Sequence, residues 1–316
     1  MRRLSPGRPA RLSRGRLARL REERGGIAVM LALLMPLLFG AAALGIDMAA
    51  VWSARQQVQT GADAAVIAVA MDCARGDCGN IKQTAEDAFW ANDEAAKLSN
   101  LGPGEGWIRV NGREVSATQK KAWLVNHFFA GALGEDTGEL SVSSYAEWAP
   151  FTEARSELPF AISYCTYKSH AASLGSKNVV TLGSGTPGGS CYTPQGEHVN
   201  GVGINFTRPD SGECGTTTVW KSTYRFQNGS LPSECSQAYI SSLVGRDVVI
   251  PVWDASHGQD FRVYGYAAFR VTGFSTTGGG RLTGYFTYSA RQVDDTTPPP
   301  RNAPDLGARA VFLTDK

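Results

Sequence analysis

The stretch that decides the fold runs from residue 24 to residue 72 and reads RGGIAVMLALLMPLLFGAAALGIDMAAVWSARQQVQTGADAAVIAVAMD. Its first half, residues 26–46, contains no charged side chain. A helix of about 20 residues at about 1.5 Å per residue is about 30 Å long, which matches the apolar core of a bilayer. We therefore expect a transmembrane helix over residues 26–47.

The charge distribution predicts the orientation of this helix. Residues 1–24 contain nine Arg and two Glu and carry +7, so the remaining residues carry −5 of the net charge of +2. Only Arg55 is basic in the 25 residues after the span. Basic residues beside a span usually stay on the cytoplasmic side. We expect a basic cytoplasmic segment over 1–25 and a single-pass plasma-membrane protein with its C-terminal bulk outside the cytoplasm.

Two alternatives compete with the retained anchor. A basic arm can bind nucleic acid, but its position directly before an apolar run favours the topological interpretation. The small residues AAALG at 41–45 could form a signal-peptide cleavage site. The apolar stretch is longer than the usual signal core of about 7–15 residues, which favours retention.

The cysteines agree with an extracytoplasmic location, because all six lie after the span. They are Cys73, Cys78, Cys165, Cys191, Cys214 and Cys235. The most local pairing is Cys73–Cys78, followed by Cys214–Cys235 and Cys165–Cys191, although sequence alone does not choose among pairings. A zinc site is the alternative, but there is no C-x-x-C and no histidine cluster beside the cysteines. Structural disulfides are favoured.

Residues 47–72 continue the helix beyond the span. Apolar residues recur at helical spacing, at Val51, Val58, Ala62, Ala65 and Val69. A ladder of small residues, Ala41, Gly45 and Ala49, is four residues apart and would let another helix approach closely. Small residues also fill ordinary anchor helices, so both interpretations stay open.

The rest of the chain predicts an α+β fold in several parts. Residues 48–150 are expected to hold the helix end, a second helix over 80–98, a hairpin at Asn111-Gly112, a short helix over 121–134 and a strand over 138–151. Residues 151–293 alternate β-branched and aromatic segments with turns, and indicate a β-rich disulfide-stapled domain with one helix near 233–245. Residues 294–316 begin with DDTTPPPRNAPD and are expected to form a Pro-rich tail.

No catalytic motif emerges. Phosphate-binding loops, zinc-protease helices and nucleophile elbows are missing from the sequence. Asp254, Ser256 and Gly258 follow a strand and partly resemble the D-x-S-x-S magnesium site of von Willebrand A domains, but an Asp-Ser turn at a strand end is favoured. We predict no catalytic, cofactor-binding or metal residues, no nucleic acid partner and no small-molecule substrate.

The opening stretch resembles the N-terminal region of the TadE/TadG-like family of the tight-adherence (Flp) pilus system. The matching features are an Arg-Gly entry, an uncharged span, an Asp after it, an Arg-Gln pair and an ADAA segment. They are Arg24, Gly25, Asp47, Arg55, Gln56, Ala62, Asp63, Ala64 and Ala65. Residues 250–274 are similar to the C-terminal region of actinobacterial TadG-like members. The resemblance implies a non-enzymatic membrane-anchored envelope protein, a pilin-like region over 48–150, and partners among the bilayer, pilin helices and pilus-machinery helices.

One departure from pilins bears on processing. Pilins cut by prepilin peptidase usually carry Glu five residues after the cleaved Gly, whereas this sequence has Met30 after Gly25 and Leu31 after Gly26. The resemblance therefore implies a retained anchor rather than a mobile pilin subunit.

The alternative function is an anchored adhesin-like module whose β-rich domain recognises a glycan or a surface protein. Its contacts would be exposed aromatic residues, namely Trp220, Tyr224, Trp253 and Tyr264. Aromatic residues in β-rich domains more often fill the core.

Overall fold

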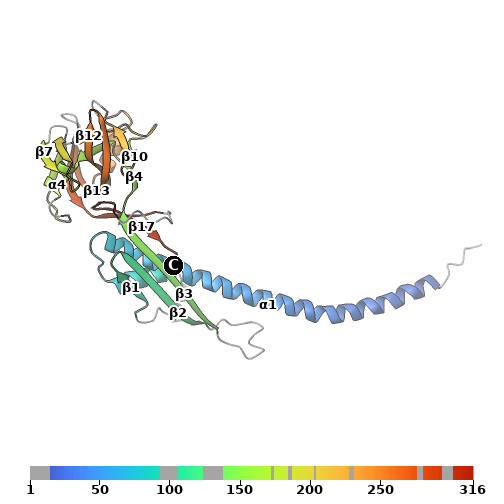
Figure 1. The fold of residues 1–316 in the computed structure, drawn as a ribbon. Helices are drawn as coiled ribbons and strands as arrows, with labels where there is room; N and C mark the ends of the chain where they lie inside the picture. The colour runs from blue at the N-terminus through green and yellow to red at the C-terminus, as the bar shows by residue number, and fades with distance from the viewer. Residues whose placement is uncertain are drawn as a thin grey trace, which may run out of the picture. The chain divides into compact units, whose positions relative to one another are not determined.

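A computed structural model of the chain describes residues 15–92, 106–123, 138–171, 174–183, 187–202, 204–227, 231–275, 280–293 and 302–315. The chain divides into two compact units, one formed by residues 1–56 with 122–140 and the other by residues 57–121 with 141–316. Helix α1, Gly15–Ala74, runs through both. Figure 1 shows the elements in chain order.

Helix α1 confirms the expected continuation of the apolar span into a polar helix. Its 60 residues include Pro36, which the helix accommodates without interruption. The helix ends where Gly76 adopts a positive φ of 97°. Cys73 and Cys78 form a disulfide across this end. The α+β fold class is confirmed.

In the second unit, the end of α1 belongs to a helix-on-sheet part. It contains α2 (Ile81–Asn92) and a five-stranded sheet in the order β1-β2-β3-β17-β15. The strands are β1 (Ile108–Asn111), β2 (Glu114–Trp123), β3 (Gly138–Pro150), β15 (Ser289–Gln292) and β17 (Ala308–Leu313). The hairpin at Asn111-Gly112 is confirmed, because Asn111 pairs with Glu114 and Gly112 has a positive φ.

Apolar spacing explains how α1 packs here. Val58, Ala62, Ala65 and Val69 are all completely buried. Their recurrence every three or four residues places them on one helix face. Val51 was expected on the same stripe, but it is exposed. The predicted stripe is therefore right from residue 58 onward.

Of the two short helices expected in this part of the chain, the first is present and the second needs correction. The first of these helices, α2, spans 81–92 within the predicted 80–98, and residues 93–98 lie outside the described part of the chain. The helix expected over 121–134 is wrong at its start, because residues 121–123 end strand β2. Pairing of β2 with its neighbours prevails over the local helical pattern. Residues 124–134 lie outside the described residues.

The C-terminal residues are not only a Pro-rich tail. Residues 308–313 form β17, which lies between β3 and β15, and residues 305–306 form β16 (Asp305–Leu306). Val311 and Phe312 are buried. The alternating ARAVFL segment has an apolar face that the sheet buries. The Pro-rich stretch before this segment made a tail the expected structure. The division of the chain at 48, 151 and 294 stays a prediction.

The β-rich part is built around an eight-stranded arrangement with the path β6-β14-β13-β12-β5-β9, with β11 and β16 also pairing with β13. Besides β16, its strands are β5 (Phe160–Ser163), β6 (Val180–Gly183), β9 (Ile204–Phe206), β11 (Thr223–Arg225), β12 (Asp247–His257), β13 (Asp260–Ser275) and β14 (Arg281–Thr287). Two smaller pairs join β4 (Glu153–Ser156) to β10 (Thr216–Val219) and β7 (Pro187–Tyr192) to β8 (His198–Val202).

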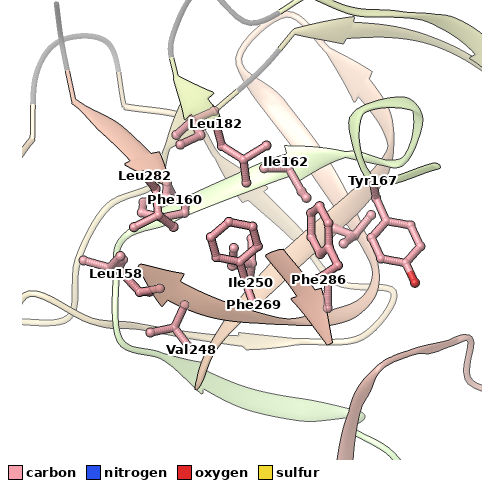
Figure 2. Close-up of a cluster of buried hydrophobic side chains, with 14 of the residues drawn as sticks. Leu158, Phe160, Ile162, Tyr167, Leu182, Val248, Ile250, Phe269, Leu282 and Phe286 are labelled. Carbon is pink, nitrogen blue, oxygen red and sulfur yellow. The ribbon is translucent and has the colours of Figure 1, made fainter. Parts of the chain in front are cut away.

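Both faces of the central strands are covered. Val248, Ile250 and Val252 on β12 point into one cluster, shown in part in Figure 2, whereas Val249 lies in a second cluster. Successive strand residues point to opposite faces, so a strand buried on both sides is apolar throughout. This explains the continuous apolar run of β12.

Two short helices interrupt the strands. Helix α5, Gln237–Ser242, lies within the helix expected near 233–245. Helix α4, Tyr164–His170, lies where the sequence predicts strands and turns, since the one helix expected in this region is near 233–245. The Ser163 side chain accepts a hydrogen bond from the Thr166 backbone N–H and so caps α4.

Disulfides join the remaining four cysteines. Cys165 on α4 pairs with Cys191 on β7, and Cys214 pairs with Cys235 before α5. With Cys73–Cys78 these are the three most local pairings along the chain.

Candidate interaction surface

The N-terminal part of α1 exposes a long apolar surface. Its large apolar side chains, from Ile27 to Met48, are exposed to about half their area or more. Helix α1 is a candidate membrane span by length and composition, and it is the one such helix among the residues the structure describes. Exposed apolar side chains over about 30 Å of helix match the solvent that a bilayer core provides.

A small-residue ladder lies open on this surface. Ala41, Gly45 and Ala49 are all exposed, and a Cβ added to Gly45 would meet no neighbouring atom within 4 Å. Ala43 and Asp47 are buried. Two residues along a helix correspond to about 200° of rotation, so the ladder faces away from Ala43 and Asp47. The ladder is therefore accessible to a second helix.

The family-motif residues are distributed along α1 rather than gathered in one site. Arg24 and Gly25 lie within the helix, Asp47 is buried, and Arg55 and Gln56 are exposed. In the ADAA segment, Ala62 and Ala65 are completely buried, whereas Asp63 and Ala64 are half-buried. The motif thus combines packing positions of the second unit with exposed positions just beyond the span.

Polar contacts fix the helix in the second unit. The Gln59 amide donates to the Asp63 carboxylate at 2.8 Å and to the Ser143 carbonyl on β3 at 3.2 Å. The Thr84 hydroxyl on α2 donates to the Asp72 carboxylate at 3.1 Å. These contacts give the polar side chains of the segment a structural role.

Arg309 on β17 binds the C-terminal end of α1, a contact that the sequence did not predict. Its guanidinium donates to the Ala74 carbonyl at 3.0 Å and to both carboxylate oxygens of Asp305 at 3.1 Å. It also lies 4.3 Å from the centroid of the Tyr288 ring. A cation at a helix C-terminus interacts favourably with the helix dipole. No sequence signal near Arg309 points to α1, since the two are more than 230 residues apart.

The aromatic residues proposed for ligand contact are mostly internal. Trp253 is buried and packs edge-on against Phe226, and Tyr224 is half-buried beside Phe261. Trp220 and Tyr264 line one pocket together. The structure thus brings together two of the four residues.

Asp254 does not form a metal site with Ser256 and Gly258. Both of its carboxylate oxygens accept hydrogen bonds from Arg262, at 2.9 and 3.0 Å, and Ser256 is exposed farther along the strand. The hydrogen bond to Asp254 raises the pKa of Arg262. Within the described residues, no three His, Cys, Asp or Glu side chains are grouped as metal ligands would be.

Comparison with known families supports the N-terminal resemblance. Residues 25–72 match a family model described as putative Flp pilus-assembly TadE/G-like. The match covers the span and the polar continuation of α1, including all the motif residues except Arg24. No curated protein and no solved structure matches the chain.

Proposed function

We propose that the protein is a non-enzymatic, membrane-anchored component of a Flp pilus assembly system, in which α1 is retained in the plasma membrane and packs laterally against pilin or machinery helices. The family match over residues 25–72 supports a role in Flp pilus assembly. The observation that carries the lateral contact is the open ladder of Ala41, Gly45 and Ala49 on a helix whose far end is packed.

The proposed orientation places the N-terminus in the cytoplasm and the second unit outside. Nine Arg precede the span and Arg55 alone follows within 25 residues. The three disulfides, all after the span, fit an oxidising compartment. The absence of Glu at Met30 and Leu31 favours a fixed anchor.

Transmembrane helices associate through small-residue ladders because the small side chains let the two backbones approach closely. A large side chain in the ladder therefore blocks the contact between the helices. The test is Gly45→Leu, with Gly40→Leu as a matched control. Gly40 has equally open surroundings but lies about 140° away from Gly45 around the helix axis. We expect Gly45→Leu to abolish surface pili, counted by electron microscopy, while Gly40→Leu leaves them near the wild-type number.

Membrane levels of both variants, measured by immunoblot, separate lost assembly from lost protein. Equal piliation in the two variants, at equal protein levels, would contradict lateral packing through the ladder. Normal piliation after deletion of the gene would contradict the pilus role itself.

A further inference from the structure

A pocket of about 540 Å³ lies in the β-rich part of the second unit. Its polar lining comprises Gln195, Lys221, Asp254, Arg262, Tyr264 and Asn302. Pockets of about 300–1,000 Å³ with a few convergent polar groups are the usual size of small-molecule sites. The described residues therefore line a candidate binding site, and their polar groups indicate the class of ligand that it would bind.

Two irregularities in strand pairing lie at this pocket. Val252 on β12 pairs with Gly265 on β13, but the next pairs are Trp253 with Val263 and Ala255 with Arg262. The pairing skips Tyr264 on one strand and Asp254 on the other. Bulges redirect side chains and are frequent next to binding sites. Both skipped residues line the pocket.

Lys221 provides a third departure from regular structure. Its φ of 64° is the one positive value at a non-glycine position in the described chain. Such a conformation is uncommon for a long side chain and persists where neighbours fix it. The Lys221 N–H donates to the Val263 carbonyl at 2.9 Å, and the Val263 N–H donates to the Ser222 carbonyl at 3.0 Å. These bonds hold the turn against β13 beside the pocket.

Among the described residues, the charges of the lining leave one cation available. Arg262 is engaged with both oxygens of Asp254, and its other neighbour is Glu197 at 3.9 Å. Lys221 forms no ion pair with any described residue; its ammonium lies 4.1 Å from the Trp220 ring centroid. Since Arg262 is paired with Asp254 and Glu197, Lys221 is the cation of the described lining that no carboxylate balances, and a ligand with a single negative charge would pair with it.

We propose that this pocket binds an acidic saccharide, a sugar unit that carries one carboxylate. Lys221 pairs with the carboxylate, while the side chains of Gln195, Asn302 and Tyr264 hydrogen-bond the hydroxyl groups. Amide and phenol groups beside the Trp220 ring suit a ligand that combines hydroxyls with apolar ring faces. A phosphate monoester carries about −1.5 to −2 at pH 7, more than Lys221 alone would balance, and Arg262, whose guanidinium suits two-point phosphate binding, is occupied by Asp254.

The binding test uses the full-length protein in detergent and isothermal titration calorimetry. The probes are D-glucuronic acid and N-acetylneuraminic acid, with D-glucose and glutarate as uncharged and non-sugar controls. We expect at least one acidic sugar to bind and each control to bind at least about tenfold more weakly. Glucose lacks the charge-assisted bond to Lys221, and glutarate lacks the hydroxyl contacts. Equal binding of glucose or glutarate, or no binding of either acidic sugar, would overturn the proposal.

Lys221→Asn tests the cation directly. Asn tolerates a left-handed backbone better than other residues do, so the turn is expected to keep its conformation. The control is Lys177→Asn, which removes the same charge from an exposed position outside the pocket. We expect a loss of about tenfold in acidic-sugar affinity for Lys221→Asn alone, at unchanged thermal unfolding temperature.

If the two variants bind the acidic sugar equally well, the site is elsewhere or the binding is non-specific. Both measurements are independent of piliation. The proposed role in pilus assembly therefore stands or falls separately from this pocket.

Discussion

Gly61 of α1 lies directly against Phe89 of α2. A Cβ at this position would lie 2.9 Å from Cδ2 of Phe89 on α2. Phe89 is completely buried and contacts the Trp107 ring edge-on, with centroids 5.6 Å apart. The ring therefore has little room to move away. The requirement for Gly comes from packing, since Gly61 is in a regular helix.

We predict that Gly61→Ala lowers the free energy of unfolding by about 1–2 kcal/mol, although Ala gains about 1 kcal/mol in helix propensity. Thermal unfolding of the full-length protein measures this loss. In the double variant, Phe89→Leu replaces the ring with a smaller side chain, so the cost of Gly61→Ala should be smaller in that background. Purely additive effects would contradict the packing explanation.

Two buried tyrosines predict alkaline sensitivity. Burial raises the pKa of Tyr167 and of Tyr266 above the usual tyrosine value. Their hydroxyls donate to the carbonyls of Leu306 at 3.2 Å and Thr218 at 2.5 Å. The folded state favours the neutral phenol. The contribution of this preference to the free energy of unfolding is therefore complete below the unfolded pKa of about 10 and is lost as the pH rises above it.

The expected loss is about 1.4 kcal/mol per tyrosine for each pH unit above about 10. Denaturant unfolding between pH 9 and 11.5 measures it, and absorbance at 295 nm reports phenol ionisation. Tyr167→Phe should reduce the slope of the free energy of unfolding against pH by about 1.4 kcal/mol per pH unit, which corresponds to one proton. Ionisation of all tyrosines near pH 10 without loss of stability would show that these two are not protected.

At the residue scale, sequence reasoning found the positions governed by helical spacing and missed those governed by distant contacts. Ala62 and Ala65 follow from the apolar period alone. Arg309 does not, because its partner Ala74 is brought close only by the complete sheet. Trp253 was a candidate contact residue, yet it is buried, since aromatic side chains in a two-sided sheet fill the core.

At the scale of elements, β17 joins the C-terminal residues to the sheet beside α1. Val311 is completely buried and pairs with Trp148 on β3 and Gln292 on β15. We predict that Val311→Asp costs more than about 3 kcal/mol, because it buries an unpaired carboxylate. Protease resistance and thermal unfolding of the full-length protein measure the effect.

Leu313 on the same strand is the matched control, because its side chain is about one-third exposed. Leu313→Asp should cost less than about 1 kcal/mol. Equal losses for the two variants would contradict the placement of β17 inside the sheet. The sequence predicts a tail here because the Pro-rich stretch is a stronger local signal than the short apolar alternation that follows it.

At the scale of the whole molecule, the proposed function requires that the anchor stay attached to the folded part. We predict that protein extracted from membranes still carries the residues before Gly26, since the sequence lacks the expected Glu at Met30 and Leu31. N-terminal sequencing with intact-mass measurement tests this. A new N-terminus at Gly26 or Ile27 would indicate prepilin-peptidase cleavage, and one just after residue 45 would indicate signal-peptidase cleavage.

The general plan of the molecule was predictable because strong local signals define it: an uncharged span, a helical continuation and alternating strands. The pairing of the five-stranded sheet was not, since it unites β1, β2 and β3 with β15 and β17 from the far end of the chain. The pocket was also hidden, because it depends on bulges at Asp254 and Tyr264 that a regular strand pattern does not reveal.

The most direct test of lateral packing is photo-crosslinking in living cells. A photoreactive residue replaces Gly45 on the ladder in one strain and Gly40 in another, and mass spectrometry identifies the crosslinked products. The account predicts a protein adduct with a pilin or pilus-machinery helix at position 45 and none at position 40. The same adducts at both positions, or lipid adducts alone at position 45, would contradict it.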